Sequence, residues 1–283
     1  MRLAMLATTF GPAPAVRLPD GLYAPIASAG PWRDLEELLQ AGVPALARVH
    51  AALERGDLAA LPGAKLLRPL SHPEKIMCIG KNYRDHCAEM KSPLPERPVL
   101  FAKYPSSLAG PEDEIPLPAV STMVDWEAEL AAVIGRTCRN VSAQEALDCV
   151  FGYTCANDLT MRDAQSQDGQ WVRAKSPDGF CPLGPALVTA DEVDDPQALD
   201  IRLSLNGKVM QSSNTREMVF GVAELVSYLS RTMTLKPGDV LLTGTPPGVG
   251  AGRDPQVFLA PGDRVVVEVE GLGALANVMR AEA

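Results

Sequence analysis

The segment of residues 124–134, VDWEAELAAVI, most constrains the fold because it places two glutamates in an apolar strand pattern. Successive strand side chains point to opposite faces, so Glu127 and Glu129 share one face. Their neighbours are apolar and mostly small, which indicates little water on either side. Two adjacent carboxylates in such a place repel each other, and a cation between them would make the arrangement tolerable. An exposed edge strand with two solvated glutamates would explain the same pattern.

A third carboxylate strengthens the cation hypothesis. Asp158 ends a second apolar run, FGYTCAND, at residues 151–158. Glu127, Glu129 and Asp158 would form an oxygen-only ligand set, which suits a hard cation: Mg²⁺ first, then Mn²⁺ or Ca²⁺. Three carboxylates leave coordination positions open for water and a chelating substrate, an arrangement for Lewis-acid catalysis.

Composition excludes several classes of protein. The net charge of -9 argues against a nucleic-acid partner, which needs a basic footprint, and no apolar run approaches the roughly 20 residues of a membrane span. The six cysteines form no C-x-x-C pair and are predicted to be buried free thiols of a reducing compartment. We therefore predict a cytoplasmic protein. Its 283 residues suffice for one large domain and one small one.

The chain divides into a small N-terminal domain, residues 1–70, and a larger domain, residues 71–283. The first begins with a strand, continues through a turn-rich region at residues 11–31, and contains a helix on which Leu35, Leu38, Leu39, Val43, Leu46 and Val49 recur at helical spacing. The second has short apolar runs separated by Gly and Pro, and Asn206-Gly207 indicates a hairpin. Its helices are predicted at residues 82–90, 142–150 and 221–233. The predicted fold class is α+β and β-rich.

A possible general base lies in the segment GKNYRDHCAEM, residues 80–90. It is typical of a loop that enters a helix, with Asn82 as the expected N-cap. His86 and Glu89 are three residues apart and so are neighbours on one helical face. A carboxylate beside an imidazole raises its basicity and fixes its orientation. An ordinary surface pair on a short helix would look the same in the sequence.

Further residues could bind an anionic substrate. Arg162 and Gln165 follow Asp158 and could contact substrate oxygens, or could belong to a helix-start network. Lys175 lies among apolar or small residues, where it could balance the acids and donate to a developing oxyanion, or could be an ordinary surface lysine. The stretch LLTGTPPGVG, residues 241–250, lacks the G-K-[ST] of a phosphate loop. Its backbone and the Thr245 hydroxyl could hold a carboxylate, or the stretch could be only a tight turn.

These motifs resemble the fumarylacetoacetate hydrolase family. The matching stretches are GKNYRDHCAEM (80–90), FAKYPSSLAGP (101–111), DWEAELAAVIG (125–135), GYTCANDLTMRDAQ (152–165), WVRAKS (171–176) and LLTGTPPGVG (241–250). They follow the family order over residues 75–280. The resemblance implies a rolled, mixed β-sandwich catalytic domain preceded by a small N-terminal α/β domain, and a homodimer with Mg²⁺ or Mn²⁺. It implies Glu127, Glu129 and Asp158 as metal ligands, His86 and Glu89 as the water-activating pair on a lid, and Arg162, Gln165, Lys175 and Thr245 as substrate contacts, with Lys175 catalytic.

The resemblance also implies the chemistry of a small anionic 2-oxo acid substrate. The leading hypothesis is hydrolysis of the C–C bond of a 2,4-dioxo acid, such as an acylpyruvate, a fumarylpyruvate-like compound or a diketo-deoxy sugar acid, through a metal-bound enolate. A first alternative is decarboxylation of a β-keto acid such as oxaloacetate, or isomerisation in aromatic catabolism. A second is a non-catalytic ligand-binding protein on the same scaffold. Family fold and metal alone do not decide among these reactions.

Overall fold

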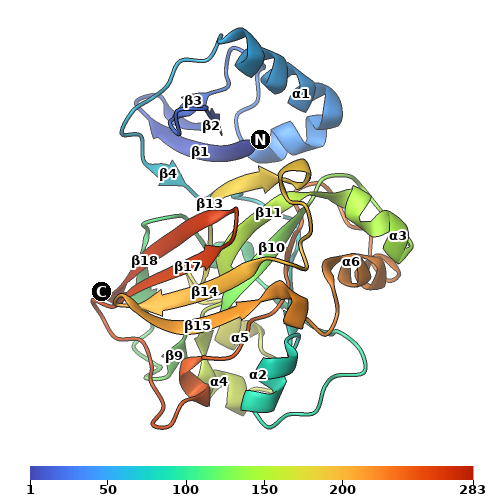
Figure 1. Ribbon diagram of the computed structural model, residues 1–283. Helices are drawn as coiled ribbons and strands as arrows, with labels where there is room; N and C mark the ends of the chain where they lie inside the picture. Colours follow the sequence, from blue (N-terminus) through green and yellow to red (C-terminus); the bar gives the residue numbers. More distant parts are fainter. Residues whose placement is uncertain (283) are drawn as a thin grey trace.

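The computed structural model describes residues 1–282, and two β-sheets form its body (Figure 1). Both sheets mix parallel and antiparallel pairs, as expected for a β-rich α+β fold. The strands are β1 (Arg2–Thr8), β2 (Gly11–Arg17), β3 (Tyr23–Pro25), β4 (Leu66–Leu67), β5 (Ile76–Gly80), β6 (Val99–Lys103), β7 (Leu108–Ala109), β8 (Glu114–Leu117), β9 (Val124–Asp125), β10 (Ala128–Ile134), β11 (Val150–Asn157), β12 (Thr160–Met161), β13 (Cys181–Thr189), β14 (Asp200–Leu205), β15 (Lys208–Asn214), β16 (Val240–Leu242), β17 (Arg264–Val269) and β18 (Gly273–Ala281).

Helices are few and flank the sheets. They are α1 (Leu35–Arg55), α2 (Arg84–Glu89), α3 (Ala143–Ala146), α4 (Arg162–Gln167), α5 (Val172–Lys175) and α6 (Val222–Ser230), with 3₁₀ turns η1 (Pro105–Ser107), η2 (Leu147–Cys149), η3 (Ala190–Glu192), η4 (Thr215–Glu217) and η5 (Gly250–Gly252). The three helices predicted beyond residue 71 are present in shorter form. Among the described residues no helix is both long and apolar enough to traverse a bilayer.

The central sheet has the strand order β3-β2-β1-β13-β11-β10-β16-β5-β6, with β4 and β7 attached to β1 and β13. A second sheet of order β15-β14-β17-β18-β8 packs on it, and the largest apolar cluster contains Leu130 from the first sheet and Leu203 and Val267 from the second. In Figure 1, β14, β15, β17 and β18 lie across the strands β10 and β11.

The N-terminal 70 residues join the central sheet, because β1 pairs with β13 through Leu3 and Leu187. Two strands, β2 and β3, lie where only turns were expected. The predicted helix is present, but Gly42 has non-helical backbone angles. Val43 was predicted to lie on the apolar face of this helix, and it is instead 78% exposed. Helix α1 and β1–β3 form the upper part of Figure 1. The division into two domains at residue 70 stays a prediction.

Local signals explain several elements. Asn206 and Gly207 both have positive φ, of 51° and 82°, as the two central residues of a tight hairpin require, and they connect β14 to β15.

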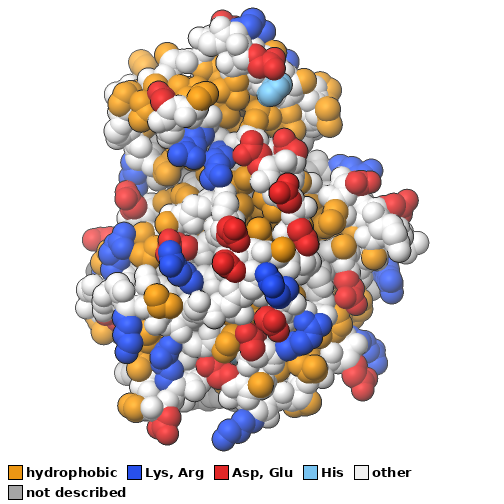
Figure 2. Space-filling view, viewed as in Figure 1, with side chains coloured by type: hydrophobic (Ala, Val, Ile, Leu, Met, Phe, Trp, Pro, Cys, Tyr) orange, Lys and Arg blue, Asp and Glu red, His pale blue; other side chains and the backbone are white. Residues whose placement is uncertain are grey.

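All six cysteines are buried and free, as predicted. Over the face shown in Figure 2, acidic and basic side chains are interspersed.

Candidate metal centre and active site

Three buried carboxylates converge where β10 and β11 pair. The segment predicted as one strand is interrupted: β9 ends at Asp125, Trp126 and Glu127 lie between strands, and β10 begins at Ala128. Antiparallel pairing places Ala128 opposite Asn157, and the Asp158 N–H donates to the Glu127 carbonyl at 2.9 Å. Glu127, Glu129 and Asp158 are 6%, 1% and 0% exposed, and each offers an oxygen within 4.8 Å of the others. They are not the solvated glutamates of an edge strand.

Two buried lysines neutralise part of this acidic cluster. The Lys175 ammonium lies 2.8 Å from Glu127 Oε2 and 2.7 Å from Asp158 Oδ2. Lys103, at the end of β6, lies 2.6 Å from Asp158 Oδ1. Burial disfavours a charged Lys175, but Asp158 and Glu127 outweigh it and raise its pKa to about 12. Lys175 is therefore a protonated donor and not a general base.

The glutamates differ in their electrostatic surroundings. Burial would raise the pKa of Glu127, but Lys175 and Arg162 lower it overall. Burial raises the pKa of Glu129 well above its ordinary value, and the charges of Asp158 and Glu127 add to the effect. Its Oε2 accepts from the Gly244 N–H at 2.7 Å, and among the described residues no cationic side chain pairs with it. A divalent cation would supply the missing positive charge, so the donor set and its charge balance fit such an ion.

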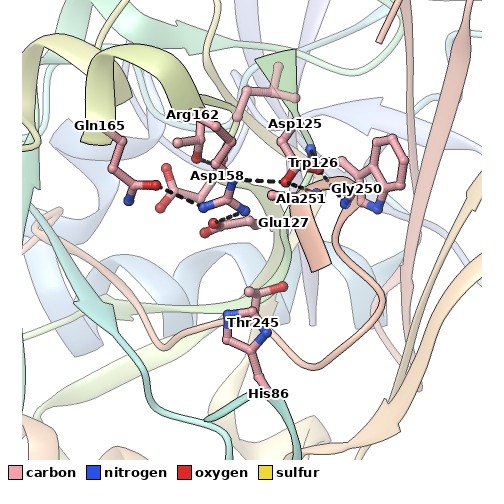
Figure 3. Close-up of polar contacts among 12 residues, drawn as sticks. His86, Asp125, Trp126, Glu127, Asp158, Arg162, Gln165, Thr245, Gly250 and Ala251 are labelled. Carbon is pink, nitrogen blue, oxygen red and sulfur yellow. Dashed lines mark hydrogen bonds and ion pairs between the residues drawn. The ribbon is translucent and has the colours of Figure 1, made fainter. Parts of the chain in front are cut away.

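Arg162 connects this cluster to a neighbouring carboxylate (Figure 3). Its Nη2 lies 2.7 Å from Glu127 Oε1 and its Nε donates to Asp125 Oδ2 at 2.8 Å. Its Nη1 donates to Gln165 Oε1 at 3.0 Å, one turn along α4. Because that amide oxygen is occupied, the Gln165 NH₂ group is the part left to donate to a ligand.

His86 and Glu89 form the expected contact on α2. His86 Nδ1 lies 3.0 Å from Glu89 Oε2, and the other oxygen of Glu89 accepts from the Gly248 N–H at 2.8 Å. We predicted Asn82 as the N-cap of α2, and this was wrong, because the N-cap is Tyr83. The Asn82 amide is instead fully buried, donates to the carbonyls of Thr243 and Phe220, and accepts from the Phe220 N–H. Asn82 thereby attaches the start of α2 to the sheet core.

One cavity of about 170 Å³ collects most of these groups. The predicted residues that line it are His86, Glu127, Glu129, Arg162, Gln165, Lys175 and Thr245. Glu89 and Asp158 lie directly behind this lining, in contact with His86 and Lys175. A larger surface hollow of about 1160 Å³, near Tyr104 and Arg173, contains none of the predicted site residues and has no comparable chemistry. The Thr245 hydroxyl donates to the Ala128 carbonyl and accepts from Gln211, so only one lone pair remains for a ligand.

Two charged residues escaped the sequence interpretation. Lys103 follows the apolar run of β6, and a lysine in that position was the available signal. Asp125 precedes Glu127 by two residues, and the alternation Asp-x-Glu-x-Glu extends the motif already noted. Both side chains are at least 98% buried. Their roles depend on partners distant in the chain, which spacing alone does not identify.

The fold and this site define a family. Residues 75–280 match the model of the fumarylacetoacetate (FAA) hydrolase C-terminal domain, and the chain belongs to the fumarylacetoacetate hydrolase family. Members named as hydrolases, tautomerases and isomerases occur among its relatives, so the chain belongs to a family of enzymes.

Two curated relatives illustrate the range of reactions. The chain is 45% identical over 289 residues to a mitochondrial oxaloacetate tautomerase of Xenopus laevis, covering 98% of this chain and 89% of that protein. It is 50% identical over 229 residues to a 2,4-didehydro-3-deoxy-L-rhamnonate hydrolase of Sphingomonas sp. (strain SKA58), covering 79% and 80%.

Solved structures agree in fold. A fumarylacetoacetate hydrolase from Exiguobacterium antarcticum has a TM-score of 0.91 and 37% identity over 100% of both chains. A maleylpyruvate hydrolase from Sphingobium sp. SYK-6, in complex with manganese(II) and pyruvate, has a TM-score of 0.84 and 34% identity, again over 100% of both chains. These similarities establish the α+β fold of the family for this chain.

Proposed function

We propose that this chain is a divalent-metal-dependent hydrolase that cleaves the C–C bond of a 2,4-dioxo acid. The observation that carries the proposal is the His86–Glu89 pair beside the same small cavity as the three carboxylates and Lys175. A family relative at 50% identity is named as a hydrolase of a diketo-deoxy sugar acid, which belongs to this substrate class. A cytoplasmic location and a homodimer remain predictions.

Glu127, Glu129 and Asp158 are proposed to hold the ion, Mg²⁺ or Mn²⁺, with Ca²⁺ as a further possibility. The manganese in the related maleylpyruvate hydrolase supports this assignment. When bound, the ion would act as a Lewis acid toward the oxygens of the 2-oxo acid. Lys103 and Lys175 offset part of the repulsion among these buried carboxylates, through their contacts with Asp158 and Glu127.

His86 is proposed as the general base. With Nδ1–H donating to Glu89, the Nε2 atom is free to accept a proton from water. The water oxygen then bonds to the distal carbonyl carbon, and the C–C bond to the pyruvate half breaks. The electron pair goes to that half as an enolate, which gains a proton to become the 2-oxo acid product. Lys175 and the Gln165 NH₂ group, which line the cavity, are proposed to donate to the negative oxygens that develop.

A second reaction is supported by a different observation. Relatives that span nearly the whole chain are named oxaloacetate tautomerases, and a cavity of about 170 Å³ suits a compact dicarboxylic acid. Keto–enol exchange moves one proton between carbon and oxygen and adds no water. Decarboxylation of oxaloacetate likewise needs no activated water. These reactions would use the same ion and Lys175 but depend differently on His86.

The deciding experiment is an ultraviolet assay. Enolised acylpyruvates absorb, so hydrolysis is followed as metal-dependent loss of absorbance, and oxaloacetate tautomerisation is followed in parallel. We expect the Mg²⁺-loaded protein to bleach a panel of diketo acids, with stoichiometric formation of pyruvate or its analogue. Tautomerisation of oxaloacetate without cleavage of any diketo acid in the panel would replace hydrolysis by the second reaction.

A further inference from the structure

The loop of residues 243–252 uses its backbone N–H groups to hold carboxylates of the protein itself. Gly244 donates to Glu129 and Gly248 donates to Glu89. Gly250 and Ala251 donate to the two oxygens of Asp125 at 2.6 and 3.0 Å. The carboxylate-binding backbone suspected from the sequence therefore exists, and three internal carboxylates occupy it.

The shape of this loop depends on glycine. Gly248 has φ of 102°, and a Cβ there would lie 2.0 Å from the Met210 carbonyl oxygen. A Cβ on Gly250 would lie 1.9 Å from the Val257 carbonyl oxygen and 2.8 Å from Asp125 Oδ1. These separations are far shorter than any real contact, so the chain approaches its neighbours as closely as the backbone permits.

Asp125 is the most fully bonded of the three internal carboxylates. It is completely buried, and each oxygen accepts from two donors: Oδ1 from the Trp126 and Gly250 N–H groups, and Oδ2 from the Ala251 N–H and Arg162 Nε. The Trp126 indole donates to the Gly248 carbonyl at 3.2 Å and adds a second tie between the same segments. Asp125 therefore fixes the loop to the segment that leads into Glu127.

The two sides of Asp125 lead to different parts of the cavity, as Figure 3 shows for its contacts with Arg162, Gly250 and Ala251. Through Arg162 it reaches Gln165, which lines the cavity. Through the loop it reaches Gly248, which holds Glu89 and so orients His86. The groups proposed to bind substrate and the groups proposed to activate water thus share one buried anchor.

We propose that Asp125 is a positioning residue that sets the placement of Glu89 and His86 relative to Arg162 and Gln165. Asp125 does not line the cavity, and in this proposal it acts through the loop of residues 243–252 and through Arg162. The inference rests on the proposed function for its kinetic consequence, while its structural consequence can be measured without any reaction.

The test begins with Asp125→Asn. Each oxygen of Asp125 accepts from two N–H donors. The NH₂ group of an asparagine, in the place of either oxygen, would therefore face donors instead of acceptors. We expect kcat for diketo-acid hydrolysis at saturating Mn²⁺ to decrease on the order of 10²-fold, because small misplacement of a catalytic group has effects of that size. KM should increase as well, because Arg162 and Gln165 lose their support. Glu89→Gln should lower kcat without the increase in KM.

A double-mutant cycle separates positioning from general damage. Because Asp125 acts through Glu89, the double variant should lose much less in kcat than the product of the two single losses. Asp239→Asn is the matched control: Asp239 is also fully buried and accepts backbone N–H groups of Lys75 and Lys236, at the opposite end of β16. The decrease in kcat caused by Asp239→Asn should multiply with the decrease caused by Glu89→Gln. Multiplicative losses for Asp125→Asn would overturn the proposal.

Hydrogen exchange provides the arm that needs no activity. Asp125→Asn should accelerate amide exchange in peptides covering residues 243–252 and also 81–92, while Asp239→Asn should leave both unchanged. If the wild type cleaves no diketo acid but this exchange pattern is seen, the proposed function fails and the positioning role stands. Unchanged exchange at residues 81–92 would refute the role even in an active hydrolase. If Asp125→Asn does not fold, Ala251→Pro replaces it in every measurement, because it removes one N–H donor to Asp125. The same results would then support or refute the proposal.

Discussion

Divalent-ion binding should release a proton from Glu129. This carboxyl is 1% exposed, and burial together with Asp158 and Glu127 raises its pKa well above the ordinary 4.5. A carboxylate must be deprotonated to ligate a hard cation, so the ion has to displace that proton. Between the ordinary and the raised pKa, we expect release approaching one proton per ion, and an affinity that increases about tenfold per pH unit.

The raised pKa of Glu129 also determines how the stability of the metal-free protein changes with pH. The folded-state pKa of Glu129 is raised, so its contribution is fully present below about 4.5 and is lost as the pH rises toward the folded value. The metal-free protein should therefore lose thermal stability across this window. An ion at 100 times its Kd adds about 2.7 kcal/mol. With 283 residues and an unfolding entropy of about 2.1 cal/mol/K per residue, that corresponds to an increase in Tm of roughly 4–5 °C.

The assay is calorimetric titration of Mn²⁺ at pH 6 and pH 7, in buffers with different enthalpies of protonation. Wild type should show a buffer-dependent heat, and Glu129→Gln should bind more weakly with no such dependence. Glu224→Gln, an exposed change on α6, is the control and should behave as wild type. Buffer-independent heats in the wild type, or equal affinity in Glu129→Gln, would refute the assignment of Glu129.

Three further results are expected. His86→Ala, with full metal content, should reduce diketo-acid hydrolysis about 10²–10⁴-fold and affect oxaloacetate reactions less; full retention of hydrolysis would show that the base is wrongly assigned. Lys175→Met should cost about 3–5 kcal/mol in urea unfolding of the metal-free protein, because it leaves Glu127 and Asp158 under-compensated, whereas exposed Lys208→Met should cost little. Light scattering should show a homodimer, and a species of only 30.1 kDa at micromolar concentration would contradict this.

Local signals carried much of the fold. The apolar run within residues 124–134 predicted the core of β10, because a strand buried on both faces is a continuous apolar run in the sequence, and every residue of β10 is buried. The hairpin at Asn206-Gly207 followed from backbone sterics alone. The break after Asp125 was not predictable in this way, since Trp126 leaves the strand to donate to the Gly248 carbonyl, 122 residues away.

Part of the site was equally beyond local inference. The sequence brought Glu127, Glu129 and Asp158 together as candidates, because each ends or lies within an apolar run. Lys103 gave only a weak signal, since its meaning comes from Asp158, 55 residues later. The ammonium group of Lys103 can be buried because it pairs with the Asp158 carboxylate. A lysine at the end of a similar apolar run, without such a partner, would remain at the surface.

The glycine-rich loop of residues 243–252 shows why motif chemistry has to be settled by contacts. From the sequence, its backbone and the Thr245 hydroxyl were candidates for holding a carboxylate, and its N–H groups hold Glu129, Glu89 and Asp125. These belong respectively to the proposed ion site, the proposed base and the anchor of Arg162. One segment therefore contacts all three, so a displacement of the loop would disturb the proposed ion binding, water activation and substrate placement together. Glycine permits the closest of these approaches, because a Cβ on Gly250 would lie 2.8 Å from Asp125 Oδ1.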